Sequence, residues 1–206
     1  MLEGFTNSDF QARTYRFGNS IDVGRYPDVD KLDSRQIREL AALLDADKLH
    51  TLVGFLDSPF KDVHPGGSRF TDGSFGVYYS AIEQETARIE AHDFYRNIVA
   101  DGATSRRVAY YRCISCDFAG TVINFMPMEG EHSYLKADTG EDKCRELARE
   151  ARAAAIDGFL TPSAGRARRG EAGVCLPVFS RASLSNPAEG PAQIFAFDPL
   201  PSGPGI

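Results

Sequence analysis

The chain contains no run of about 18 consecutive apolar residues, the length needed to span a bilayer. Its first residues, MLEGFTNSDF, lack the basic region followed by an apolar run that a secretory signal requires. It also has no basic excess, because 23 Lys and Arg residues stand against 29 Asp and Glu residues, for a net charge of −6. These absences argue against a membrane protein and mildly against a direct nucleic-acid binder, and they predict a cytoplasmic protein.

Cysteine is scarce too, with Cys113, Cys116, Cys144 and Cys175 as its only occurrences. Cys113 and Cys116 form a CxxC pair, but no second CxxC and no HxxxH completes a zinc site. A redox-active CxxC normally opens a helix after a strand, whereas this pair stands inside the β-like run YYRCISCDF. We therefore expect reduced, partly buried thiols and no metal.

The residues that are present suit one globular domain. Of the 206 residues, 42% are hydrophobic and 25% are charged, which is ordinary for a soluble protein with an apolar core. We expect a single domain over residues 1–206, with its core at about residues 14–180 and with residues 1–13 and 182–206 as peripheral tails.

Alternating and helical hydrophobic patterns predict the elements. Strands are expected at residues 14–17, 75–81, 107–118, 121–125, 158–161, 174–179 and 193–198. Helices are expected at residues 35–46, 48–56, 83–99 and 142–155, with Gly158 ending the last of them. Strands and helices are interspersed without regular βαβ spacing, so the sequence predicts an α+β fold with a mixed sheet and flanking helices.

One segment, GGSRFTDGSFGVYYSAIEQETARIE at residues 66–90, places three chemically useful side chains on consecutive elements. Arg69 follows a Gly-Gly turn that permits close backbone approach to a ligand, and Glu90 lies on a helix. Between them a short strand carries Tyr78 and Tyr79, and alternation lets only one of the two face a site. An arginine, a tyrosine and a glutamate suit an anionic ligand with an aromatic base and a ribose.

A second segment, GFLTPSAGRARRG at residues 158–170, sets Ser163 beside three arginines. The Ser163 hydroxyl can donate to a phosphate or ribose, or it can cap a turn. A nucleophilic serine would stand in a G-x-S-x-G elbow, which TPSAG is not, so a serine hydrolase is the least favoured function. Arg166 is the candidate phosphate ligand, and we expect Arg168 and Arg169 to form a solvated face or to contact a partner.

Five short motifs occur in order along the chain: GSRF at 67–70, YSA at 79–81, TARIE at 86–90, GFLTPSAGR at 158–166 and CLPVF at 175–179. This series resembles the RES domain over about residues 14–179. The family is named for an Arg, a Glu and a Ser, which correspond to Arg69, Glu90 and Ser163. The motif register also favours Tyr79 over Tyr78 as the site tyrosine.

The resemblance implies a fold similar to that of ADP-ribosyltransferases. Many RES proteins are bacterial toxins that consume NAD+, and a Xre-type antitoxin protein often neutralises them. Some split NAD+ with water or phosphate, and others transfer ADP-ribose to a protein. The resemblance thus implies an NAD+-degrading toxin, with an ADP-ribosyltransferase or a non-catalytic nucleotide- or partner-binding module as alternatives.

The implied catalytic residues are Arg69, Tyr79 and Glu90, and the implied NAD+-binding residues are Arg69, Tyr79, Ser163 and Arg166. Breaking the nicotinamide–ribose bond passes through an oxocarbenium-like state, which the Glu90 carboxylate would stabilise. Arg69 would hold the pyrophosphate or the nicotinamide-ribose side through its planar fork of donors, and Tyr79 would stack on the nicotinamide. From the residues alone, the favoured interpretation of Glu90 is an exposed helix residue, paired with Arg88 or His92 or unpaired.

The chain departs from the family pattern in two places. Relatives often continue the arginine motif with an Asn/Ser-Pro-Gly stretch, whereas this chain has Thr-Asp-Gly-Ser at residues 71–74. Just before the last strand, some relatives carry Asn where this chain has Cys175. Both departures bear on the detail of the site and leave the expected fold unchanged.

Overall fold

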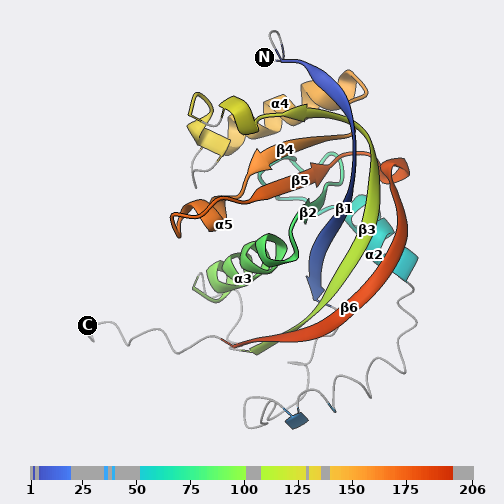
Figure 1. Ribbon diagram of the computed structural model, residues 1–206, viewed down its shortest axis with the longest axis vertical. Helices are drawn as coiled ribbons and strands as arrows, with labels where there is room; N and C mark the ends of the chain where they lie inside the picture. Colours follow the sequence, from blue (N-terminus) through green and yellow to red (C-terminus); the bar gives the residue numbers. More distant parts are fainter. Residues whose placement is uncertain are drawn as a thin grey trace.

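The structure is a computed structural model of the 206-residue chain, and it describes residues 2, 5–19, 35–36, 39, 52–100, 108–128, 130–135 and 140–196. Figure 1 shows how the elements are arranged. In chain order they are β1 (Asn7–Asn19), α2 (Leu52–Lys61), β2 (Tyr78–Ala81), α3 (Gln84–Ala100), β3 (Val108–Asn124), the 3-10 turns Met126–Met128 and Ser133–Leu135, α4 (Glu141–Ala153), β4 (Gly158–Pro162), α5 (Ala164–Ala167), β5 (Val174–Val178), the 3-10 turn Arg181–Ser183 and β6 (Leu184–Ala196).

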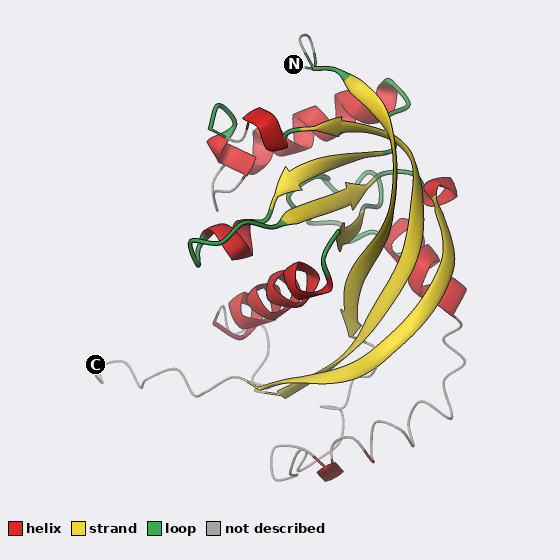
Figure 2. Ribbon diagram, viewed as in Figure 1, coloured by secondary structure: helices red, strands yellow, loops and turns green. Residues whose placement is uncertain are grey.

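The described strands form one mixed sheet in the order β1-β2-β5-β4-β3-β6. Because β1 also pairs along β3, the strands β1, β2, β5, β4 and β3 close into a ring, joined between β1 and β2 by the pair Tyr15–Ala81. The pairing of β3 with β4 is parallel, and the others are antiparallel. Figure 2 shows the long, curved β1, β3 and β6 side by side, with the shorter β2, β4 and β5 to the left of them. This arrangement confirms the predicted α+β class.

The strands near the two ends of the chain correct the expectation of peripheral tails. Residues 7–13 form the first half of β1, which pairs with β3 along its whole length. Residues 184–196 form β6, which pairs with β3 on the opposite edge. Residues 7–13 and 184–192 are too polar to stand out as strands, whereas the end of β6 belongs to the strand predicted at 193–198. Their strand form comes from pairing with β3, which satisfies their backbone hydrogen bonds.

β3 also joins two segments that the sequence predicts as separate strands. Gly120 lies at the predicted break, where an added Cβ would come within 2.6 Å of Oδ2 of Asp157. The same oxygen accepts a hydrogen bond of 2.8 Å from the backbone N–H of Thr121. Glycine is therefore needed for the close approach of the Asp157 carboxylate, and it does not interrupt the strand.

The prediction that Gly158 ends α4 was wrong. The helix ends at Ala153, and Ala155 then takes the left-handed conformation with φ 56°. Gly158 is instead the first residue of β4, where an added Cβ would lie 2.9 Å from the backbone carbonyl oxygen of Pro177 in β5. The glycine thus serves the close packing of two strands.

Other predicted elements agree with the structure or shift by a few residues. The helix expected at 83–99 is α3, and the strands expected at 158–161 and 174–179 are β4 and β5. The strand expected from residue 75 begins only at Tyr78, and the helix expected at 48–56 is displaced to Leu52–Lys61. The helix expected at 35–46 lies almost wholly outside the described residues.

The core has three apolar clusters that follow the two faces of the sheet. One packs under α4 and includes Phe125, Leu147 and Phe159. A second lies on the other face of the short strands and includes Tyr78 and Leu176, and a third packs beneath α3. α3 and α4 thus flank the face of the short strands that the second cluster does not occupy. No helix of the described part is long and apolar enough to cross a membrane.

The CxxC pair is divided between two of these clusters. Cys113 belongs to the cluster beneath α3, and Cys116 belongs to the cluster around Tyr78. Both thiols are buried and free, and burial raises the pKa of Cys113. Within the described residues, no group of three or more His, Cys, Asp and Glu side chains is arranged to hold a metal ion.

Candidate active site

Glu90 and Ser163 lie 73 residues apart in the sequence and are in direct contact in the fold. The Ser163 hydroxyl donates a hydrogen bond of 2.5 Å to Oε1 of Glu90. Ser163 is buried and follows the last residue of β4, whereas Glu90 is half-buried on α3. The carboxylate therefore has a fixed position at the end of the sheet, where helix α3 meets the β4–α5 connection.

The short helix α5 supplies a second donor to the same carboxylate oxygen. The backbone N–H of Gly165 donates to Oε1 of Glu90 at 2.8 Å. Ser163 is the N-cap of α5, and its hydroxyl oxygen accepts the backbone N–H of Arg166 at 3.0 Å. Ser163 therefore caps α5, which is one of the two roles that the sequence left open, and its hydroxyl proton is directed to Glu90.

Arg69 is held on a tight turn. Gly67 takes φ 71°, and an added Cβ would lie 2.3 Å from the backbone oxygen of Thr71, so the turn requires glycine there. The guanidinium of Arg69 donates to the backbone oxygen of Leu135 at 2.9 Å and remains half-buried. Arg69 thus lies on the α4 side of the molecule, next to the 3-10 turn Ser133–Leu135.

The Tyr79 hydroxyl holds the same turn on both sides of Arg69. It bonds to the Ser68 hydroxyl at 2.7 Å and accepts the backbone N–H of Phe70 at 2.9 Å. Burial raises the pKa of Tyr79, so the phenol stays protonated. Its neighbour Tyr78 is fully buried in the core, which agrees with the prediction that only one of the two tyrosines faces outward.

The register of the short strands places three side chains of the candidate site, Tyr79, Thr161 and Cys175, on one face of the sheet, which is called the floor of the site below. Tyr79 is paired with Pro177, and Ala81 is paired with Cys175, which is also paired with Thr161 of β4. Residues paired directly across antiparallel strands point to the same face, and alternate residues of a strand do so as well. Tyr79, Cys175 and Thr161 therefore share one face, with Tyr79 and Cys175 on a diagonal.

Cys175 connects this floor to the Glu90 cluster. Ser163 and Glu90 both act on the pKa of its thiol, so these three side chains lie close together. Burial, followed by the charge of Glu90, raises the pKa of the Cys175 thiol well above its ordinary value, so the thiol is a neutral donor. One sheet face thus carries both pairs, Arg69 with Tyr79 and Glu90 with Ser163. Within the described residues no hydrogen bond or ion pair joins Arg69 to Glu90.

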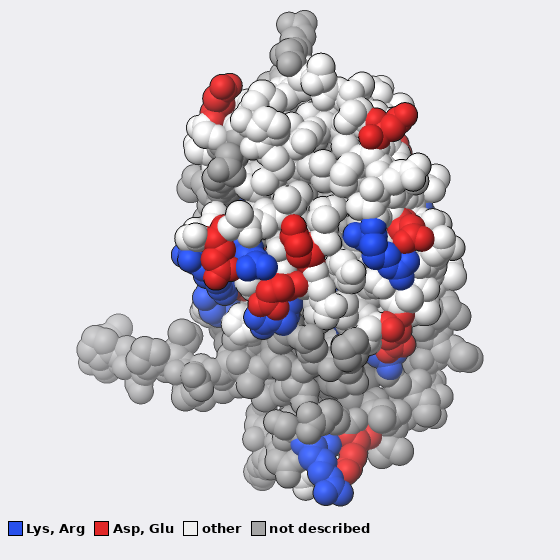
Figure 3. Space-filling model, viewed as in Figure 1, with Lys and Arg blue, Asp and Glu red and all other residues white. Residues whose placement is uncertain are grey.

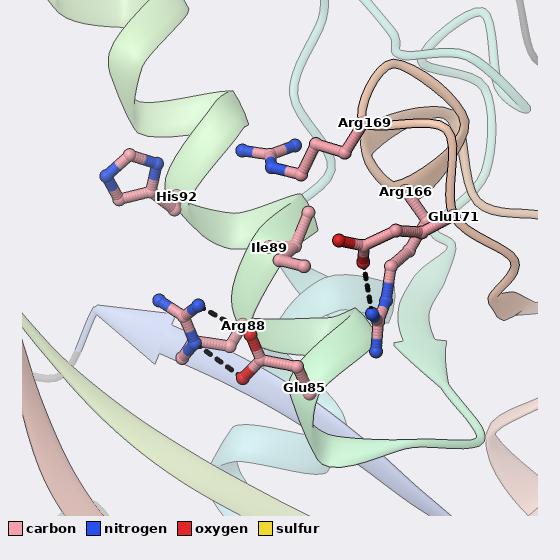
Figure 4. A pocket seen from close by; sticks show the side chains of 7 residues that line it. All are labelled: Glu85, Arg88, Ile89, His92, Arg166, Arg169 and Glu171. Atoms are coloured by element: carbon pink, nitrogen blue, oxygen red, sulfur yellow. Dashed lines mark hydrogen bonds and ion pairs between the residues drawn. The ribbon is translucent and has the colours of Figure 1, made fainter.

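Arg166 lines a pocket of about 370 Å³ formed by α3, α5 and the segment that follows α5. The pocket is lined by Glu85, Arg88, Ile89, His92, Arg166, Arg169 and Glu171 (Figure 4). Arg166 pairs with Glu171, and its Nε donates to Thr86 at 3.3 Å. A phosphate bound by Arg166 would therefore share the guanidinium with Glu171, whose side chain is half exposed.

The structure corrects the expectation that Arg168 and Arg169 form a solvated face or contact a partner. Both guanidinium groups bind the carboxylate of Asp93, whose side chain is 2% exposed. Burial alone would raise the pKa of Asp93, but the hydrogen bonds from Arg169 and Arg168 outweigh it and hold that pKa well below its usual range. Figure 3 shows basic and acidic side chains interspersed on the visible face, without one large basic patch.

Sequence reasoning missed Asp93 as a residue of the site. The signal for it was the helical spacing of Thr86, Ile89 and Asp93, which put an acid on the same stripe as a buried isoleucine. An acid on a buried stripe needs a cationic partner, and the arginines at 168 and 169 were the available ones.

Comparisons with known proteins agree with this fold. A family model described as the RES domain matches residues 43–198. Among solved structures, the chain is similar to one from the crystal structure of the M. tuberculosis MbcT–MbcA toxin–antitoxin complex, with 13% identity, a TM-score of 0.52 and coverage of 89% of this chain and 86% of that chain. At this identity the likeness concerns the fold alone. No curated protein gives a significant match.

Proposed function

This chain belongs to the RES-domain family, and from that membership and the site geometry we propose that it is a toxin that cleaves the nicotinamide–ribose bond of NAD+. The observation that carries the proposal is the doubly hydrogen-bonded Glu90 carboxylate on the same sheet face as Tyr79 and Arg69. The similar solved structure is that of a toxin–antitoxin complex, which supports the toxin role.

The proposed chemistry divides between two residue pairs, Arg69 with Tyr79 and Glu90 with Ser163. Arg69 binds the pyrophosphate or the nicotinamide-ribose side of NAD+, and the Tyr79 ring packs on the nicotinamide while its hydroxyl stays engaged with the turn. The bond between ribose C1′ and the nicotinamide nitrogen breaks, and its electron pair leaves with neutral nicotinamide. Glu90, fixed by Ser163 and Gly165, stabilises the positive charge that develops on the ribose.

The acceptor then bonds to C1′ and loses a proton. Water yields ADP-ribose, and inorganic phosphate yields a phosphorylated ADP-ribose. A protein side chain would instead make the chain an ADP-ribosyltransferase. No contact of the described residues selects among these acceptors, so we propose NAD+ cleavage as the common step.

The deciding experiment incubates purified protein with NAD+, with and without phosphate, and identifies the products by mass spectrometry. We expect free nicotinamide together with ADP-ribose or its phosphorylated form. Glu90→Gln should lower the rate about 10²–10³-fold, the usual loss on removing one transition-state electrostatic group. Glu146→Gln is the control, because Glu146 is an exposed glutamate of α4 and lies outside the pocket lined by Arg166. Intact NAD+ with the unmodified chain would contradict hydrolysis and phosphorolysis.

We also propose that an antitoxin protein of the Xre type covers this site. The cationic Arg69 is a suitable target for an acidic group of such a partner. Arg69→Glu should therefore weaken the complex in a co-purification assay with an antitoxin encoded beside this chain. Unchanged binding by Arg69→Glu would place the antitoxin elsewhere on the surface.

A further inference from the structure

Asp93 lies one helical turn after Glu90 on α3 and is the most heavily bonded carboxylate near the site. Both of its oxygens face arginines: Arg169 donates to Oδ2 at 2.8 Å and to Oδ1 at 2.7 Å, and Arg168 donates to Oδ2 at 2.9 Å. Arg169 therefore grips the carboxylate with two donors, the geometry in which arginine binds most specifically. These bonds of Asp93 with Arg168 and Arg169, called the clamp below, join α3 to the segment that follows α5.

Arg169 also contacts the backbone that orients Glu90. Its Nη1 donates to the backbone oxygen of Gly165 at 2.6 Å, while the N–H of Gly165 donates to Glu90 at 2.8 Å. An added Cβ at Gly165 would lie 2.8 Å from Ile89 and 3.2 Å from Oδ2 of Asp93, so the residue sits directly against α3. Gly165 is therefore held at both ends, by Glu90 on one side and by the Asp93–Arg169 pair on the other.

Helix α5 cannot hold this position by itself. It has four residues, far fewer than an isolated helix needs to be stable in water. The contacts of α5 with α3 must therefore fix where Ser163 and Gly165 stand. Because Asp93 is buried, removing Arg169 would leave its carboxylate with weaker compensation from Arg168 and Arg96, so the contact is also sensitive to substitution.

We propose that Asp93 is a positioning residue for Glu90, acting through Arg169 and the Gly165 peptide. The inference rests on the proposed function, because it assigns to Asp93 the task of holding the Glu90 carboxylate where the ribose charge develops. Asp93 touches neither the ribose nor the acceptor in this scheme. Asp93 acts on catalysis only through the two hydrogen bonds that Glu90 accepts, from Ser163 and from the Gly165 peptide.

Two variants test the clamp. Asp93→Asn keeps the shape and removes the charge, and Arg169→Lys keeps the charge balance and removes the two-pronged grip. For NAD+ consumption we expect kcat to fall about 10- to 100-fold, as misplacement of a catalytic group by about 1 Å does, while KM changes much less. Lys61→Gln is the control, since its ion pair with Asp57 lies within α2, away from α3 and α5.

A double-variant cycle separates positioning from general destabilisation. If Asp93 acts through Glu90, Asp93→Asn should cause no further loss of rate in a Glu90→Ala background. An equal fractional loss in both backgrounds would overturn the proposal. Arg169→Lys with wild-type kcat would overturn it as well, even if Asp93→Asn failed to fold.

Amide hydrogen exchange at Gly165 gives a readout that does not need turnover. The Gly165 N–H should exchange faster in Arg169→Lys than in the unmodified chain and in Lys61→Gln, because its bond to Glu90 loosens. If the unmodified chain leaves NAD+ intact, the proposed function fails, and the exchange rate of Gly165 still decides the clamp. Unchanged exchange would overturn the positioning role whatever the activity.

Discussion

Removing the hydroxyl of Tyr79 isolates the part of the site that holds Arg69. Tyr79→Phe keeps the aromatic ring and deletes the atom that bonds to Ser68 at 2.7 Å and to the backbone N–H of Phe70 at 2.9 Å. The N–H of Phe70 would lose its partner in a largely buried place, which costs about 1–3 kcal/mol. We therefore expect the free energy of unfolding to fall by about 1–3 kcal/mol.

The assay is chemical denaturation, with thermal unfolding as a check. In a chain of this length each kcal/mol corresponds to about 2–4 °C in Tm. Tyr78→Phe is the matched control: among the described residues its hydroxyl accepts a single weak bond of 3.7 Å, from the Cys116 thiol, so the loss should be below about 1 kcal/mol. Equal stability losses in the two variants would refute the assignment of the Tyr79 hydroxyl as the support of the turn.

The same variant carries a prediction about activity. With the turn loosened, Arg69 would meet NAD+ in a less defined geometry, so NAD+ consumption should fall severalfold although the stacking ring is still present. Full activity in a Tyr79→Phe protein that is measurably destabilised would mean that the ring alone matters. That result would separate the structural role of the hydroxyl from the catalytic role proposed for the side chain.

Three further predictions concern other parts of the fold. Gly158→Ala should destabilise the chain by about 1–3 kcal/mol in denaturation, since its Cβ would lie 2.9 Å from a backbone oxygen of β5, whereas Gly130→Ala, with nothing within 4 Å, should have little effect. Burial raises the pKa of the Cys144 thiol to about 11. The stabilisation by the protonated thiol is therefore fully present below the unfolded pKa of about 8.5 and is lost as the pH rises toward 11. Cys144→Ala should flatten the plot of unfolding free energy against pH between these two values, and an unchanged slope would exclude this thiol as the cause of the pH dependence. Arg145→Gln should raise KM for NAD+, because Nε of Arg145 donates to the backbone oxygen of Ser68 at 2.9 Å beside the Arg69 turn; an unchanged KM would show that the turn does not depend on this bond.

The local elements were largely predictable because they rest on short-range patterns. The helical stripe of α3 and the apolar runs of β4 and β5 were placed within a few residues. The glycine at 158 was assigned to the wrong task, since a helix stop and a close strand contact both favour glycine and only the neighbouring strand tells them apart. The polar strand at residues 7–13 escaped prediction because its stability comes from pairing with β3.

The sequence alone determined the α+β class, the helix that carries Glu90 and the alternation that turns Tyr78 and Tyr79 to opposite faces, since each follows from the periodicity of a single segment. The tertiary structure decided which distant groups meet. Ser163 reaches Glu90 across 73 residues, and Arg169 reaches Asp93 across 76. Side-chain contacts over such separations depend on how the sheet closes, and no local pattern encodes that closure.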